Sequence, residues 1–176
     1  LLVKELGLSH HLSTGFIRSS IAHLLPEKEN LFLQRHTYDA YEALPYPVTE
    51  GRTPLLEGAI QQSLLLKPSI ESCVRRASQE GIGMVVEGTH FIPGIIDPSS
   101  LGADLMCILD VPDRDELSKR AHSQNHAKRS LSDQQRLCLA ELQEAILSMA
   151  KDHGNPVVVN NDIHEAIAQV RALVGM

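Results

Sequence analysis

Three short apolar runs constrain the fold of this chain more than any other feature. The runs are residues 82–86, 105–109 and 157–159. Each run ends at a polar side chain, namely Glu87, Asp110 or Asn160. Apolar runs without polar alternation predict strands that are buried on both faces, as in parallel sheets. Helical patterns separate the runs, so we predict an α/β fold built on a doubly wound parallel sheet.

The segments between these runs carry helix signals. We predict a short strand at residues 9–13 and helices at residues 16–24, 31–44 and 54–80. Pro68 lies inside the last of these helices, which predicts either a kink or two helices, and Gly81 should end it. Two further helices are marked near the C-terminus by apolar stripes. Asp113 and Asp162 each precede a Glu by three positions, as in capping boxes.

The composition of the chain argues against several classes of protein and of binding partner. The 176 residues fit a single domain, and the formal net charge of −6 argues against general binding to nucleic acid. No apolar run approaches the roughly 20 residues needed to span a membrane. The three cysteines, Cys73, Cys107 and Cys138, are far apart and form no CxxC. Buried thiols in a reducing cytoplasm explain them better than a metal or redox site. The sequence gives no indication of oligomeric state.

Polar residues at the predicted strand ends are where a doubly wound sheet binds its ligand. Glu87 could face a hydrated Mg²⁺ on nucleotide phosphates, or it could be an ordinary surface acid. Arg18 could pair with a phosphate or carboxylate, or it could be a solvated helix arginine. His90 follows Glu87 closely and is a candidate for a hydrogen bond to substrate.

A polar stretch at residues 121–130 is flanked by cations and resembles a lid over a phosphoryl-transfer site. Lid arginines stabilise the charge of a transferring phosphoryl group. Arg120 and Arg129 are the candidates, and an ordinary charged loop is the competing interpretation. The sequence contains no Gly-x-x-x-x-Gly-Lys-Ser/Thr, and none of its eleven glycines is followed by lysine.

Several motifs resemble those of the 2-phosphoglycerate kinase family. Residues 81–94 read GIGMVVEGTHFIPG, which resembles the family's strand followed by Glu-Gly-x-His, two apolar residues and Pro-Gly. Residues 13–18 (STGFIR) resemble its Ser-Thr-Asp-x-Ile-Arg, and residues 37–41 (TYDAY) its Ser-Tyr-x-Ala-Trp. Residues 154–162 resemble its closing strand and Asn-x-Asp turn. The resemblance extends from about residue 5 to the C-terminus.

The resemblance implies a three-layer P-loop kinase that phosphorylates 2-phosphoglycerate with ATP and Mg²⁺. It implies that Thr14, Arg18, Tyr38 and His90 line the acceptor site. Glu87 would support the metal ion through water. The family's first strand and P-loop would then precede residue 1, and we expect about 15–30 further residues there, a guess from strand and loop lengths. That strand normally lies mid-sheet, and its loss would leave neighbouring strands unpaired.

Two departures from the family pattern leave the acceptor open. Gly15 stands where the family has Asp, and Ala140 stands where it has an Arg. We therefore expect an ATP-dependent kinase acting on a small phosphorylated acid such as 2-phosphoglycerate, or a divergent relative with another acceptor such as a polyol phosphate. The alternative is a non-catalytic, P-loop-like regulatory or ligand-binding domain.

Overall fold

The computed structural model describes residues 2–121 and 130–176. The chain divides into two compact units, residues 1–106 and residues 107–176. Each unit contains one pair of parallel strands. The chain is therefore a mixed α/β protein with parallel strands, as predicted. The described strands pair two by two, so a single doubly wound sheet and a single domain stay predictions.

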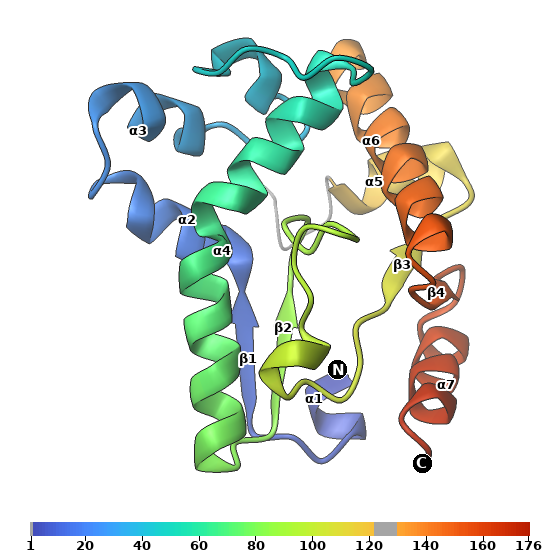
Figure 1. Cartoon of the computed structure of the whole chain (residues 1–176). Coiled ribbons are helices and arrows are strands. Elements are labelled where there is room, and N and C mark those ends of the chain that lie inside the picture. The colour runs from blue at the N-terminus through green and yellow to red at the C-terminus, as the bar shows by residue number, and fades with distance from the viewer. Residues whose placement is uncertain (1, 122–129) are drawn as a thin grey trace. The chain divides into compact units, whose positions relative to one another are not determined.

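The first unit is built on strands β1 (His10–Ser13) and β2 (Met84–Glu87), which lie side by side in Figure 1. They pair in parallel, with Ser13 opposite Glu87. Both strands were predicted to within two residues at each end. Because they run in the same direction, their carboxyl ends meet at one edge, and the loops that follow start beside each other.

The first unit also contains four helices and two 3₁₀ turns among its described residues. They are α1 (Leu2–Glu5), α2 (Thr14–Ala22), α3 (Glu27–Gln34), α4 (Pro54–Glu80) and the 3₁₀ turns η1 (Ala40–Ala43) and η2 (Ser99–Leu101). The single helix predicted over residues 31–44 is wrong, because α3 ends at Gln34 and Arg35 is extended. The break falls where the Arg35 carbonyl accepts from Arg18 and Gln62, which belong to other helices.

Helix α4 runs unbroken through Pro68, so the alternative of two helices is wrong. The Thr53 side chain caps its first turn, Pro54 occupies the first helical position, and Gly81 ends it with φ 65°. One face is buried along most of its length. Its side chains Leu66 and Ile70 are fully buried in the core of this unit, and burial of that face offsets the hydrogen bond lost at proline.

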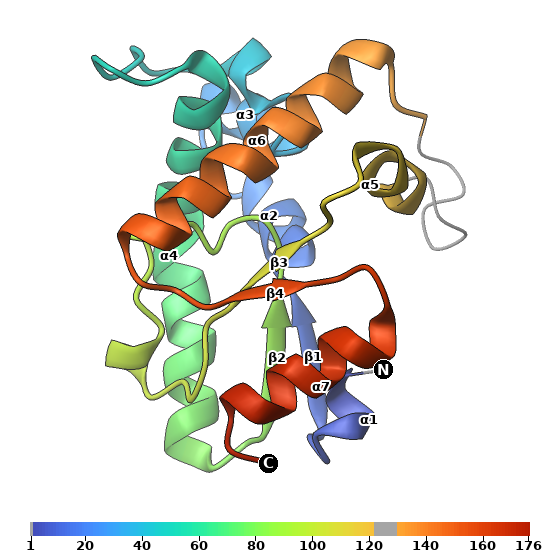
Figure 2. The same cartoon turned by 90° about the vertical axis from the view of Figure 1, so that its right-hand side faces the viewer.

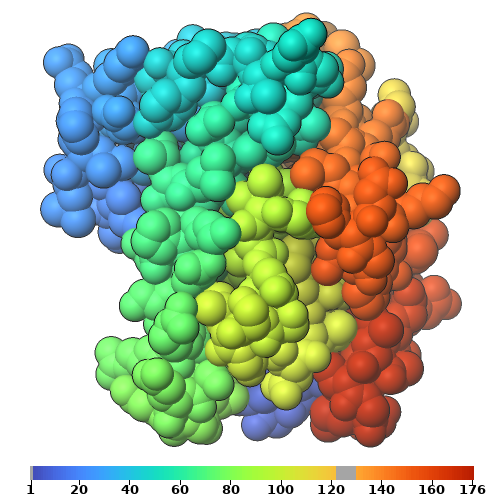
Figure 3. Space-filling view, in the orientation of Figure 1, coloured from blue at the N-terminus to red at the C-terminus, as the bar shows by residue number. Residues whose placement is uncertain are grey.

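The core of the first unit lies between α2, α3, α4 and the segment that follows β2. Its buried members are Ala22, Phe32, Leu33, Ala40, Leu66, Ile70 and Ile96. The space-filling view shows α4 on the surface beside the segment after β2 (Figure 3), where Lys67 Nζ donates to the Ile95 carbonyl at 2.8 Å. This packing fixes the loop that leaves the carboxyl end of β2.

The second unit has strands β3 (Ile108–Asp110) and β4 (Val157–Val159), which pair in parallel (Figure 2). Its helices are α5 (Arg114–Ala121), α6 (Asp133–Asp152) and α7 (Ile163–Leu173). Helix α6 packs against β3, and α7 packs against β4. No described helix in either unit is long and apolar enough to cross a membrane.

The helix starts of the second unit match the sequence signals in part. Asp113 Oδ1 accepts from two backbone N–H groups at the start of α5, and Asp162 Oδ1 does the same for α7. Both predicted caps are confirmed. A complete reciprocal capping box is found instead at α6, between Ser132 and Gln135, where it was not predicted.

Candidate functional site

The carboxyl ends of β1 and β2 bring two predicted site segments together. The Ser13 Oγ accepts from the Gly15 N–H at 3.3 Å, so α2 begins directly at the end of β1. Glu87 lies opposite Ser13 and its side chain is 53% exposed. Its carboxylate is 3.7 Å from His11 Nε2. An exposed carboxylate thus stands beside the N-terminus of a helix.

Gly88 lets the loop after β2 approach α2 closely. It adopts φ 143°, and a Cβ at this position would lie 1.7 Å from Thr14 Oγ1. A side chain here would therefore both strain the backbone and collide with a buried hydroxyl. Thr14 is fully buried, so it cannot move aside into solvent. Glycine after the strand-end Glu is a structural requirement in this fold.

A chain of side-chain hydrogen bonds runs behind this edge. Thr14 Oγ1 lies 2.8 Å from His90 Nδ1, and Thr37 Oγ1 lies 3.3 Å from His90 Nε2. Thr37 Oγ1 also lies 2.8 Å from Thr89 Oγ1. Three of the four residues are buried, and Thr89 is exposed. The structure thus connects segments 14, 37 and 89–90, which are far apart in the sequence.

His90 is 2% exposed, and both its ring nitrogens are engaged by threonine hydroxyls. Burial, with a smaller contribution from the positive charge of Arg18, lowers the pKa of His90 to about 3. The imidazole is therefore neutral at physiological pH. The Ser63 hydroxyl on α4 donates to the His90 carbonyl at 2.6 Å and fixes the backbone there. Contact between His90 and substrate stays a prediction. In this structure the imidazole ring is hydrogen-bonded to Thr14 and Thr37.

Arg18 projects from α2 toward the C-terminal end of α3. Its Nη1 donates to the carbonyls of Leu33 and Arg35. Gln62, fully buried on α4, donates from Nε2 to Phe32 O at 3.0 Å and to Arg35 O at 3.1 Å. A cation is favourable at a helix C-terminus, where carbonyls lack intrahelical partners. The guanidinium is therefore held in place near His90, and its contact with substrate stays a prediction.

Tyr38 is packed beside the same network. Its ring stacks on His36, with ring centroids 5.2 Å apart and an interplanar angle of 13°, and the residue is 6% exposed. Contact between Tyr38 and substrate stays a prediction. Gly15, by contrast, has space around it, because an added Cβ would meet only Ser13 Oγ, at 3.4 Å. A Cβ atom would therefore be accommodated at this position.

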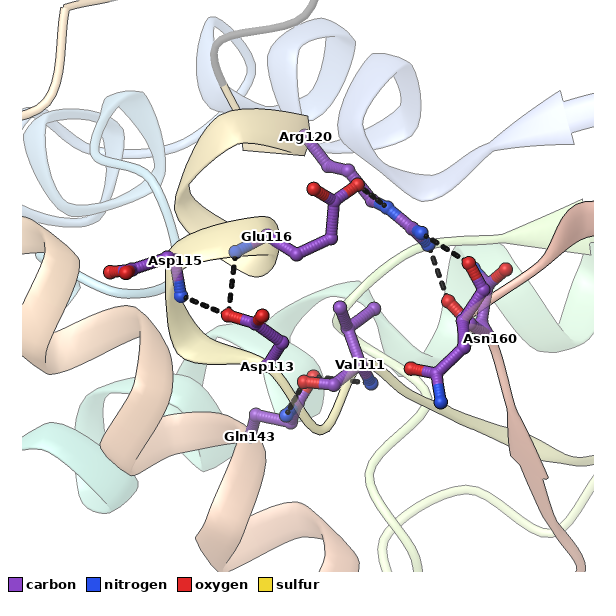
Figure 4. Close-up of polar contacts among 8 residues, drawn as sticks. Val111, Asp113, Asp115, Glu116, Arg120, Gln143 and Asn160 are labelled. Carbon is purple, nitrogen blue, oxygen red and sulfur yellow. Dashed lines mark hydrogen bonds and ion pairs between the residues drawn. The ribbon is translucent and has the colours of Figure 1, made fainter.

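Arg120, one of the predicted lid cations, lies on α5 of the second unit. Its Nε donates to Glu116 at 2.8 Å, and its other nitrogens donate to the carbonyls of Asn160 at 2.5 Å and Asn161 at 3.0 Å. Figure 4 shows this guanidinium turned toward the chain that leaves β4. It ties α5 to the end of β4. Its lid role stays a prediction, and Arg129 lies outside the described residues.

Gln143 holds the carboxyl end of β3. Its amide accepts from the Val111 N–H at 3.2 Å and donates to the Val111 carbonyl at 3.1 Å (Figure 4). It also donates to Asp110 Oδ1 at 3.3 Å. Ala140, where the resemblance led us to expect an arginine, is buried on the same helix. The polar contact of α6 with this strand end thus comes from Gln143.

Sequence reasoning missed several residues that shape these strand ends. They are Thr37, Gln62, Ser63, Thr89 and Gln143. For Ser63 a signal existed, since its spacing of seven residues from Ile70 places this polar residue on the apolar face of α4. The threonines carried no signal beyond their proximity to motif residues. Their partners come from other segments, which no local pattern reveals.

Among the residues that the structure describes, no three His, Cys, Asp or Glu side chains form a group that could hold a metal ion. Glu87 is a single exposed carboxylate. Such a group suits a metal ion that arrives already bound to nucleotide phosphates and keeps several waters.

The fold and the strand-end site define a class: an α/β protein with parallel strands whose helix N-terminus and acidic strand end meet at one edge. This class is compatible with a P-loop kinase-like fold. The chain is similar along nearly all of its length to curated 2-phosphoglycerate kinases, which supports its assignment to that family. The resemblance predicted from the motifs is confirmed.

Three relatives illustrate the similarity. The 2-phosphoglycerate kinase of Thermococcus kodakarensis is 23% identical over 176 residues, covering 97% of this chain and 59% of the relative. That of Methanothermobacter thermautotrophicus is 26% identical over 176 residues, covering 96% and 58%. That of Methanopyrus kandleri is 25% identical over 173 residues, covering 94% and 52%. The chain thus spans little more than half the length of these relatives. No family model and no solved structure gave a significant match.

Proposed function

We propose that this chain forms the acceptor side of a small-molecule kinase, which transfers a phosphoryl group from ATP to a small phosphorylated acid such as 2-phosphoglycerate. The proposal includes a doubly wound, P-loop kinase-like sheet. Its support is the similarity to enzymes named 2-phosphoglycerate kinase. The observation that carries it is the register of β1 and β2, which sets Glu87 opposite Ser13 at the start of α2.

The residues present meet one requirement of ATP with Mg²⁺, which is a carboxylate that can hold the hydrated metal ion. When bound, ATP supplies the phosphoryl group, which passes to the acceptor hydroxyl as the bond to ADP breaks and the hydroxyl proton leaves, while Mg²⁺ offsets phosphate charge. Glu87 would hold the hydrated metal ion through water, and its half-exposed carboxylate is free of any partner closer than His11 at 3.7 Å among the described residues.

The residues of the first unit would position the acceptor. Arg18 contributes a fixed positive charge, because its guanidinium is held against the end of α3. The N-terminus of α2 adds backbone N–H groups and a favourable dipole for anions. Tyr38 and His90 form the buried wall behind these groups. Arg120 and Arg129 would act as lid cations over the transferring phosphoryl group. Positioning and charge neutralisation are the main demands of this chemistry.

The experiment compares wild type with Glu87→Gln, using the protein as its gene encodes it. ADP release is measured with a panel of phosphorylated acceptors that includes 2-phosphoglycerate. Loss of an outer-shell carboxylate should lower kcat about 10- to 100-fold and leave acceptor binding nearly unchanged. Glu80→Gln is the matched control, since Glu80 is an exposed carboxylate on α4 that pairs with Arg76. Equal rates for wild type and Glu87→Gln would refute the role of Glu87.

The second candidate function is a non-catalytic ligand-binding domain. Two observations favour it: Gly15 replaces the family's acid, and the Arg120 guanidinium is engaged by Glu116 and two backbone carbonyls. This alternative predicts that the acceptor binds with ordinary affinity while no ADP forms with any compound of the panel.

A further inference from the structure

The hydrogen-bond chain through His90 has a direction that can be worked out from burial. Thr14 is fully buried, and among the described residues the one side-chain partner of its hydroxyl is His90 Nδ1. A buried hydroxyl that fails to donate leaves its hydrogen unsatisfied, which costs free energy. Thr14 therefore donates, and Nδ1 of His90 accepts.

The remaining steps follow from the neutral imidazole, which has one donor and one acceptor. Because Nδ1 accepts, Nε2 carries the proton and donates to Thr37 Oγ1. Thr37 is 5% exposed, and its other side-chain partner in the described structure is Thr89 Oγ1. Thr37 therefore donates to Thr89. The Thr89 hydroxyl receives this bond, and its own hydrogen remains available.

Thr89 is the exposed end of the chain, two residues after Glu87 at the carboxyl end of β2. Its hydrogen has no acceptor among the described residues, so it can be donated only to solvent or to a ligand. With the opposite polarity, Thr89 would donate inward and could only accept from a ligand. The direction of the hydrogen bond at the buried Thr14 thus determines whether the exposed Thr89 can donate a hydrogen bond to a ligand.

We propose that Thr89 binds the acceptor by donating to one of its anionic oxygens, phosphate or carboxylate, and that His90 in its Nε2–H form is the positioning residue that sets this polarity. The inference rests on the proposed function and adds to it a binding residue and the sign of its hydrogen bond. The low pKa of His90 agrees with this, because protonation would make both ring nitrogens donors.

The tautomer is tested by nitrogen NMR of protein labelled with ¹⁵N-histidine. The His90 signals are identified by their loss in His90→Gln. We expect a protonated Nε2 and an unprotonated Nδ1, both without ligand and with 2-phosphoglycerate present. A protonated Nδ1, or a mixture of the two neutral forms, would overturn the proposed polarity. This readout needs no activity and no ligand, so it stands apart from the proposed function.

The role of Thr89 is tested by binding measurements on wild type, Thr89→Val and the conservative control Thr89→Ser. The compounds are 2-phosphoglycerate, glycerol 2-phosphate, which lacks the carboxylate, and glycerate, which lacks the phosphate. Thr89→Val should weaken 2-phosphoglycerate binding about tenfold, and Thr89→Ser should change it less than about twofold. A matching loss with glycerol 2-phosphate alone assigns the phosphate, and one with glycerate alone assigns the carboxylate.

Equal affinities of wild type and Thr89→Val for every compound that binds would overturn the assignment of Thr89. If wild type binds none of the three, the proposed acceptor site fails and the contact of Thr89 fails with it. The polarity set by His90 is then decided by the NMR readout alone.

Discussion

At the end of β2, His90 converts a short surface loop into a fixed structure by joining Thr14 and Thr37 through its ring. A buried neutral histidine suits this task, since it can accept at one nitrogen and donate at the other. Its neutrality comes mainly from burial, which lowers its pKa to about 3. The residue is therefore coupled to stability as well as to the site.

This coupling predicts an acid dependence. In the unfolded chain His90 has a pKa near 6.5, so below that value the unfolded state binds more protons than the folded state. The stability is complete above about pH 6.5 and declines as pH falls toward 3. Between about pH 7 and pH 5 the loss should be about 2 kcal/mol. Urea unfolding of wild type and His90→Gln should show their difference shrinking over this range.

A constant difference between the two proteins over that range would contradict the prediction. The carboxylates Asp113 and Asp162 do not interfere. Helix-cap hydrogen bonds lower their pKa values below the ordinary 3.8, so their contributions are lost only in stronger acid.

At the residue scale the sequence predicts the positions of site residues better than their roles. Glu87 was placed at a strand end by the apolar run before it, and the structure has it there. A hydrogen bond from His90 to substrate stays a prediction. The contacts of the buried His90 ring with Thr14 and Thr37 were not predicted, because a local pattern cannot report contacts between distant segments.

At the element scale, the close approach of the β2 loop to α2 predicts the effect of Gly88→Ala. The added methyl group would collide with Thr14 Oγ1 and the backbone would be strained at φ 143°. We expect a loss of at least about 2 kcal/mol in the free energy of unfolding. Gly81→Ala is the control, because Gly81 also has a positive φ, 65°, but nothing lies within 4 Å of its added Cβ.

The control should cost about 1 kcal/mol, from backbone strain alone. Similar losses in the two variants, measured by urea unfolding, would show that the contact of Gly88 with Thr14 is not tight.

In the second unit, Gln143 connects α6 to the end of β3 by bonding both backbone groups of Val111. Gln143→Leu keeps the size of the side chain and removes these bonds. The Val111 N–H and carbonyl would then lack partners, at a cost of about 2–3 kcal/mol in unfolding free energy. Gln134→Leu on the same helix is a control for the substitution itself. A loss no larger than that of the control would contradict the role of Gln143.

Elements were predictable where the signal is local. The strands follow from apolar runs, and the caps of α5 and α7 follow from Asp113 and Asp162. The end of α3 at Gln34 was not predicted, because apolar residues continue at helical spacing through Leu44. The chain breaks there where Arg18 and Gln62 bind the terminal carbonyls, and both partners come from other helices.

At the scale of the whole molecule, both the strand pairs and the sequence similarity agree with a kinase-like α/β protein. Each unit holds a pair of parallel strands, with polar side chains where the strands end. The similarity to 2-phosphoglycerate kinases runs through both units. The α/β class with parallel strands and the similarity to 2-phosphoglycerate kinases could thus be predicted from apolar runs and motifs. The pairing of strands into sheets could not, because register and partner choice depend on tertiary contacts.

The central claim is phosphoryl transfer to a small phosphorylated acid, and its most direct test follows the transfer itself. The protein as its gene encodes it is incubated with ATP, Mg²⁺ and 2-phosphoglycerate, and phosphorus NMR detects any doubly phosphorylated product. We predict that the product forms with wild type and Glu80→Gln, and about 10- to 100-fold more slowly with Glu87→Gln. Binding of 2-phosphoglycerate without any product, or equal rates in all three proteins, would contradict the account.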